Sequence, residues 1–175
     1  ELFTNSGVKK NIVIIGDSGT GKSETLEAIK QIGSNYINEM KIVFDDMGTF
    51  SFKDNIVVAS GTEVGAFVRL DDLGAGYVFE EMDRAIFLNP SQQNSRLVTP
   101  MSSYDYISRK HNIDLVLYAN NYEDNDVGLK LFNNKEEALK TFKQGRRIAK
   151  GTTNETGLVE TYFANPFGPV QKFEQ

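Results

Sequence analysis

Short apolar runs separated by polar and glycine-containing turns set the pattern of this chain. Residues 11–15 and 114–119 are the two strongest apolar runs and predict strands, and residues 114–119 are apolar almost throughout, which is typical of a strand in the centre of a sheet. Shorter segments between and after these runs have strand-like composition, and two strands flank a Lys-Asp-Asn turn. These further strands are expected at residues 41–44, 51–59, 85–88 and 159–164.

Helical spacing is clear in only two places. Leu26, Ile29 and Ile32 recur at intervals of three after the first apolar run. The second helix is expected over residues 135–150, with Asn134 as its N-cap, because an asparagine side chain can accept from the first free backbone N–H groups. Two helices among many strands are too few for a doubly wound sheet. The sequence therefore predicts a mixed, β-rich α/β fold.

A complete phosphate-binding loop, G-x-x-x-x-G-K-S, lies between the first apolar run and the first helix, at residues 16–23. Strand, glycine-rich turn and helix in this order are the context that the motif requires. In such loops successive backbone N–H groups surround phosphate oxygens, and the positive end of the helix dipole adds to them. The alternative is a glycine-rich turn without a ligand. The residues expected to bind a nucleotide are Gly16, Asp17, Ser18, Gly19, Thr20, Gly21, Lys22, Ser23 and Glu24.

Side chains in and near the loop supply the rest of the expected chemistry. Lys22 is expected to reach the terminal phosphates as a point charge, and Ser23 to offer its hydroxyl to Mg²⁺. A kinase with a phosphate-binding loop also needs a carboxylate at the end of a neighbouring strand to hold the metal. Asp45-Asp46 follows the apolar residues 42–44 and could supply it. Two carboxylates could hold two metals, or one could bind metal while the other takes a proton. A solvated turn is the alternative without function.

Composition narrows the class of protein. The 175 residues, 39% hydrophobic and 25% charged, fit one globular domain with its own core. A net charge of −5 without a long Lys/Arg run argues against nucleic acid, and no apolar run is long enough to predict a membrane span. The lack of cysteine excludes disulfides and favours a reducing, cytoplasmic location. The chain begins at Glu1 rather than Met, which leaves open that it is a piece of a longer protein.

The amino-acid sequence of the loop, together with Asp45-Asp46, resembles the corresponding motifs of the phosphoenolpyruvate carboxykinase superfamily, which also contains HPr kinase/phosphorylase. The loop with Glu24 resembles the HPr kinase version most. The rest of the chain resembles the C-terminal, nucleotide-binding half of ATP-dependent phosphoenolpyruvate carboxykinase, through a series of segments in the right order. These segments are the Asn-Ser-Arg…Pro string of residues 94–101, the strand at 113–119, the helix and loop at 136–153, and the closing residues 161–168.

This resemblance implies a carboxykinase-like P-loop fold that binds ATP with Mg²⁺ and Mn²⁺. Lys22 and the loop amides would hold the β- and γ-phosphates, with Ser23 on Mg²⁺. Asp46 would match the manganese-binding aspartate of the family, and Asp45 the one that contacts the magnesium shell. Arg96 would match the arginine that reaches the transferring γ-phosphate. The adenine would lie against the loop that begins with Gly151, Thr152 and Thr153.

Other residues of the family have no counterpart here. In carboxykinases a lysine and a histidine upstream of the loop complete the manganese site, and an arginine further upstream binds the carboxylate substrate, but only ten residues precede the first apolar run. His111, the only histidine, is expected to be an exposed turn residue rather than a ligand. The chain taken alone is therefore expected to have negligible carboxykinase activity with oxaloacetate.

Three functions stay open. The first is an ATP-dependent phosphotransferase that resembles the nucleotide-binding part of the carboxykinase, with a small-molecule acceptor and a further N-terminal domain as partner. The second is an HPr kinase-like protein kinase. The amino-acid sequence of the loop favours this function, but the few residues before the loop include no catalytic histidine, which argues against it. The third is a non-catalytic ATP-binding module, which the missing metal ligands favour.

Overall fold

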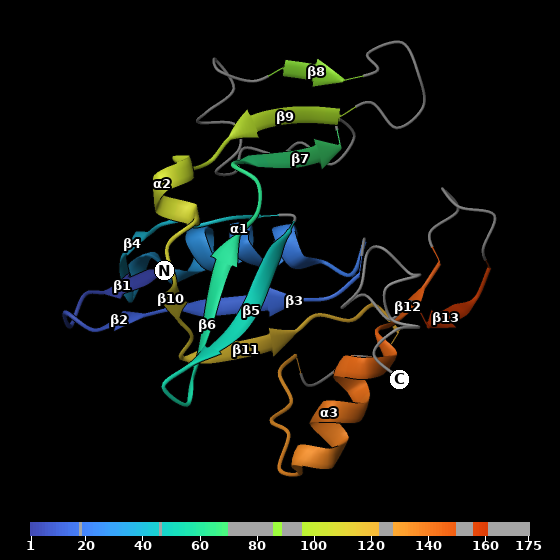
Figure 1. Ribbon diagram of the computed structural model, residues 1–175. Coiled ribbons are helices and arrows are strands. Elements are labelled where there is room, and N and C mark those ends of the chain that lie inside the picture. The colour runs from blue at the N-terminus through green and yellow to red at the C-terminus, as the bar shows by residue number, and fades with distance from the viewer. Residues whose placement is uncertain are drawn as a thin grey trace. The chain divides into compact units, whose positions relative to one another are not determined.

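Figure 1 shows the computed structural model, which describes residues 1–17, 19–45, 47–69, 86–88, 96–122, 128–149 and 156–160. The chain divides into two compact units. Unit 1 consists of Glu1–Val13 and Ser23–Val116, and unit 2 consists of Ile14–Lys22 and Leu117–Gln175. Strands are many and helices few in the described part, so the coarse prediction of a mixed, strand-rich α/β fold is confirmed.

Within its described residues, unit 1 contains three small antiparallel sheets. The first has the order β2-β1-β4, with bounds Lys9–Lys10, Leu2–Thr4 and Ile37–Met40. The second has the order β10-β6-β5, with bounds His111–Asn112, Ile56–Gly61 and Gly48–Lys53. The third has the order β7-β9-β8, with bounds Gly65–Arg69, Arg96–Pro100 and Ile86–Leu88.

A tight hairpin joins β5 to β6. Its two central residues, Asp54 and Asn55, both have positive φ, of 51° and 64°. Two successive left-handed residues are the signature of a turn that matches the right-handed twist of the strands, and Asp and Asn tolerate that conformation better than most residues. The two strands expected around the Lys-Asp-Asn turn are thus confirmed, with Lys53 paired to Ile56.

The core of unit 1 is formed largely by β6, β7, β9 and the short helix α2 (Tyr104–Ile107). Among the side chains that the structure describes, the fully buried apolar ones are Val58, Ala59, Ala66, Leu97 and Ile107. At its border, the ring of Phe44 packs against two glycines that face each other in the β5–β6 register, Gly48 and Gly61. A Cβ on either glycine would approach atoms of Phe44 to 2.5–2.7 Å, so only glycine leaves room for the ring.

Two expectations for unit 1 are wrong. Residues 41–44 are not a strand. The strand β4 ends at Met40, and the side chain of Phe44 packs over the paired glycines instead. Asp45 therefore does not follow a strand end. His111 is not in an exposed turn: it pairs with Ala59 in β10, and its side chain is only 10% exposed. Local composition does not reveal these tertiary contacts.

The division between the units passes through a pair of strands, β3 (Ile12–Ile15) and β11 (Leu115–Tyr118). Hydrogen bonds from Asp114 N to Asn11 O and from Ala119 N to Ile15 O show that the two strands run in parallel. Both strands were predicted, β11 as a central one. Among the described residues they pair only with each other, and Leu115 is 45% exposed.

The two longer helices of the described part are the ones that the sequence predicts. α1 (Lys22–Ile32) continues into a short 3₁₀ turn at Gly33–Asn35. In unit 2, α3 (Lys135–Gln144) begins as predicted, because the side chain of Asn134 accepts a 2.8 Å hydrogen bond from Glu136 N. It ends six residues earlier than the predicted 150, because Gly145 adopts a left-handed conformation (φ 54°) that closes the helix.

The chain after α3 forms a hairpin of β12 (Arg146–Ile148) and β13 (Leu158–Glu160). Arg147 pairs with Val159 across it, and Ala149 N donates to Gly157 O beyond the last pair. Leu158–Glu160 overlaps the closing strand predicted at 159–164, whose remaining residues lie outside the described part. In unit 1, the strand predicted at 85–88 is present as β8, in which Ile86 is 60% exposed.

The side chain of Glu1 is the centre of a polar cluster in unit 1. Its carboxylate lies 2.8 Å from Lys9 Nζ and 3.3 Å from His111 Nδ1, and it accepts a hydrogen bond from the Tyr106 hydroxyl. Burial on its own would raise the pKa of this carboxyl, but the hydrogen bonds from Lys9, Tyr106 and His111 lower it to about 2. Burial and the same carboxylate raise the pKa of Tyr106 to about 12.

This lowered pKa predicts a pH-dependent contribution to stability. A carboxyl with a folded-state pKa of about 2, against its usual 4.5, stabilises the fold fully above pH 4.5 and progressively less as the pH falls toward 2. Glu1→Gln should therefore lower the free energy of unfolding by roughly 1–3 kcal/mol at pH 7, and the loss should shrink at pH 3. Urea unfolding of both proteins measures it. Glu39→Gln, at an exposed glutamate of β4, is the control, and an equal loss at both pH values for Glu1→Gln would contradict the account.

Candidate functional site: the phosphate loop

The phosphate loop connects β3 to α1, as the motif predicts. Its backbone explains its glycines. A Cβ at Gly16 would lie 2.5 Å from Thr20 Oγ1 and 2.8 Å from the carbonyl oxygen of Ala119, so the chain passes too closely there for any side chain. Gly19 and Gly21 have φ angles of 75° and 94°, which L-residues rarely adopt.

The carbonyl oxygen of Asp17 is the acceptor around which the loop closes. It accepts from Thr20 N at 3.3 Å, from Thr20 Oγ1 at 2.7 Å and from Lys22 Nζ at 3.0 Å. Thr20 is almost fully buried. The ammonium group of Lys22 is thus folded back onto the loop itself.

The side chain of Asn121 links the loop to the β12–β13 hairpin by hydrogen bonds. Asn121, Gly19 of the loop and the hairpin all belong to unit 2. Its Nδ2 donates to the carbonyl oxygens of Gly19, at 3.3 Å, and Ile148, at 3.2 Å. Its Oδ1 accepts from Ile148 N at 2.7 Å. Nearby, the Tyr118 hydroxyl donates to Arg146 O at 3.1 Å. Because Asn121 holds Gly19 by its carbonyl, it restricts the peptide groups of the loop.

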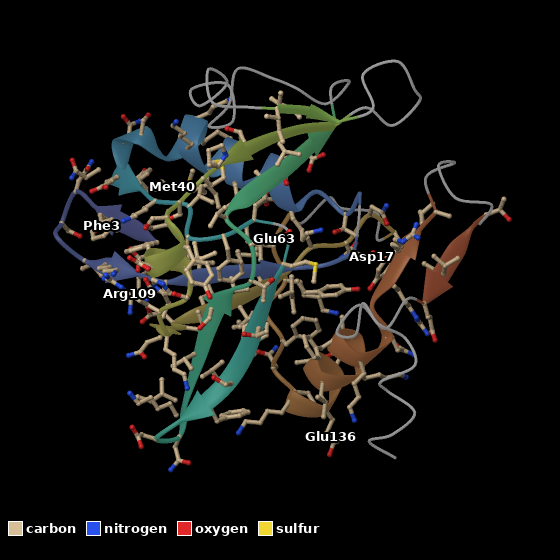
Figure 2. All side chains as sticks on the ribbon, turned by 45° about the horizontal axis from the view of Figure 1, so that its top comes forward. Phe3, Asp17, Met40, Glu63, Arg109 and Glu136 are labelled. Carbon is tan, nitrogen blue, oxygen red and sulfur yellow. The ribbon has the colours of Figure 1, made fainter. Side chains whose placement is uncertain are left out.

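An ion pair makes a second link between the loop and the hairpin. Arg147 Nε lies 2.6 Å from Asp17 Oδ2, and the two side chains are only 11% and 20% exposed. Figure 2 shows Asp17 beside the β12–β13 hairpin. Sequence reasoning assigned no role to Asn121 or Arg147, since 102 and 130 residues separate them from their partners in the loop. Only contacts between distant parts of the chain reveal them.

The other predicted residues are distributed as follows. Ser23 and Glu24 occupy the first turn of α1, where an acidic residue interacts favourably with the helix dipole. Asp45 is half-buried in unit 1, directly after the anchored Phe44. Arg96 is the first residue of β9, also in unit 1. The predicted residues outside the described part are Ser18, Asp46, Gly151, Thr152 and Thr153.

No described part of the chain gathers three or more His, Asp or Glu side chains in a way that could hold a metal ion. The acidic pair is represented in that search by Asp45 alone, since Asp46 is not described. None of the described helices is long and apolar enough to cross a membrane.

No protein-family model, curated protein or solved structure matches this chain. The functional argument therefore depends on the residues themselves. The loop is their most informative part, because a complete motif stands there between a strand and a helix.

The role of Asn121 can be tested through the mobility of the loop. Asn121→Ala removes three hydrogen bonds, of which the one to the Gly19 carbonyl is partly buried, and should cost about 1–3 kcal/mol of stability. Amide hydrogen exchange of Gly19–Lys22 should accelerate more than exchange in β5 and β6. Asn5→Ala, which removes one bond from an exposed asparagine to Asn35 O, is the matched control. Unchanged exchange in the loop would contradict this role.

Proposed function

We propose that this chain binds a nucleoside triphosphate, ATP in the first place, together with Mg²⁺ in the phosphate loop, as the nucleotide-binding part of a phosphotransferase. The observation that carries the proposal is the loop geometry: positive φ at Gly19 and Gly21, immediately before the N-terminus of α1. Backbone N–H groups presented by such a turn, next to a helix N-terminus, form an anion site that suits phosphate oxygens.

Lys22 is the proposed cation for the terminal phosphates. In the structure its ammonium donates to the carbonyl oxygen of Asp17 at 3.0 Å. A phosphate oxygen is a stronger acceptor for an ammonium group than a neutral carbonyl, because the bond then joins two opposite charges. Binding of nucleotide is expected to exchange the first bond for the second, with little rearrangement of the loop.

Metal binding is proposed for Ser23 together with the acidic pair. Mg²⁺ prefers six oxygen ligands and usually keeps several waters, so one hydroxyl, one or two carboxylates and the phosphates themselves suffice. Ser23 lies in the first turn of α1, where the motif places its hydroxyl for this purpose. Asp45 and Asp46 supply the carboxylates in this proposal, and Mn²⁺ is the second metal that the family resemblance suggests.

The remaining assignments rest on the family resemblance. Arg96 is proposed to stabilise the charge that develops on the γ-phosphoryl group during transfer. Residues 151–153, in the connection between β12 and β13, are proposed to contact the adenine. The acceptor in this proposal is a small molecule bound with the help of a further domain.

Removal of the Lys22 ammonium tests nucleotide binding. Lys22→Ala should weaken Mg·ATP binding by about 1.5–3 kcal/mol, roughly tenfold to a hundredfold, as expected for hydrogen bonds between charged groups. Titration calorimetry measures the change. Lys53→Ala, at an exposed lysine of the β5–β6 hairpin, should bind as the parent does. Equal affinity of the parent and Lys22→Ala would rule out the assigned site.

The acidic pair should make nucleotide binding and stability depend on divalent metal. Two carboxylates near a polyphosphate repel it unless a cation lies between them. Mn²⁺ plus ATP should therefore raise the melting temperature of the parent, through linkage of binding to folding, and raise that of Asp46→Asn clearly less. Asp54→Asn, which changes an exposed aspartate in the hairpin turn, is the control. Equal stabilisation of Asp46→Asn and the parent would make the metal assignment wrong.

A further inference from the structure

The phosphate loop contains an acidic residue, Asp17, at its second position. Within residues 16–23 its charge cancels that of Lys22, so the loop segment alone has no net positive charge for a polyphosphate. The carbonyl of Asp17 also lies 3.0 Å from Lys22 Nζ. An unpaired carboxylate on this residue would repel phosphate and compete for the ammonium group that phosphate binding needs.

Arg147 is positioned to compensate this charge. Its Nε lies 2.6 Å from Asp17 Oδ2, and the pair is largely shielded from solvent. The backbone on both sides of Arg147 is held: Arg146 O accepts from the Tyr118 hydroxyl, and Ile148 exchanges hydrogen bonds with Asn121. β12 therefore presents the guanidinium group to the loop from a restrained backbone rather than from a free surface chain.

We propose that Arg147 is the counter-ion of the phosphate loop: by pairing with the Asp17 carboxylate, it keeps that charge from opposing the phosphates and from binding Lys22. Arg147 is a positioning residue in this account and does not itself contact the nucleotide. The inference rests on the proposed binding of nucleotide in this loop. It adds Arg147 to the charged residues of the site and makes the β12–β13 hairpin a condition for phosphate affinity.

If Arg147 acts by compensating charge, its removal and the removal of the Asp17 charge should have opposite effects on Mg·ATP binding. A purely structural role of Arg147 would not produce that pattern. Arg147→Met exposes the Asp17 carboxylate and should weaken Mg·ATP binding about tenfold, as one unit charge does at a partly screened site. Asp17→Asn removes one negative charge from the loop while the Arg147 guanidinium remains, and should tighten binding by about threefold or more. The double variant Asp17→Asn/Arg147→Met removes both charges and should bind within about threefold of the parent.

Calorimetric titration with Mg·ATP, and with Mg·tripolyphosphate to isolate the phosphates, measures these effects at two salt concentrations. The differences should shrink as ionic strength rises, because salt screens charge but not packing. Arg146→Met is the matched control: it removes the same charge from the neighbouring residue, which pairs with Glu160 at 2.9 Å and not with the loop. It should bind Mg·ATP as the parent does.

Three results would overturn the inference: parent-like binding by Arg147→Met, a double variant as weak as Arg147→Met alone, or Asp17→Asn that binds no tighter than the parent. The last result decides the question even if Arg147→Met does not fold. If the parent binds neither ligand, the proposed function fails and the inference fails with it. If the parent binds both and its variants do not differ, the inference alone is wrong.

Discussion

The phosphate loop is held both by its own hydrogen bonds to the Asp17 carbonyl and by contacts with residues that lie far away in the sequence. Three glycines give the loop the backbone conformations that it needs, but glycine also has the most conformational freedom to lose on folding. Asn121 offsets this cost with three hydrogen bonds, two of them to β12 and one to the Gly19 carbonyl. The Asp17–Arg147 pair adds a charged link to the same strand. The hairpin that follows α3 is thus linked to the loop, although it lies more than a hundred residues later in the chain.

Unit 1 is organised by side chains that fill specific backbone gaps rather than by one large sheet. Phe44 occupies the space above the facing glycines of the β5–β6 hairpin, which fixes the segment that leads to Asp45. The Glu1 carboxylate gathers Lys9, Tyr106 and His111 around itself. These contacts join residues up to 110 positions apart, so small sheets from different parts of the sequence form one compact unit.

The sequence predicted best where the signal was local. The Asn134 cap, the turn at Asp54 and Asn55, and the strand–loop–helix order around the motif all depend on a few neighbouring residues. Predictions that depended on tertiary partners were wrong. The composition of the apolar residues 42–44 is strand-like, but in the structure Phe44 packs against two glycines instead of lying in a strand. Asn121 and Arg147 carry no motif, so sequence reasoning could not place them in the site.

The most direct test of the account is to locate bound nucleotide by the backbone amide signals of the protein. Nuclear magnetic resonance titration of the ¹⁵N-labelled chain with Mg·ATP should shift the amides of Gly19, Thr20, Gly21, Lys22 and Ser23 first and most. Those of the β5–β6 hairpin should stay in place. Saturable shifts confined to the loop and the adjoining β12–β13 hairpin are the predicted result. No saturable shift in the loop, or shifts centred elsewhere, would contradict the central claim that this loop is a nucleotide site.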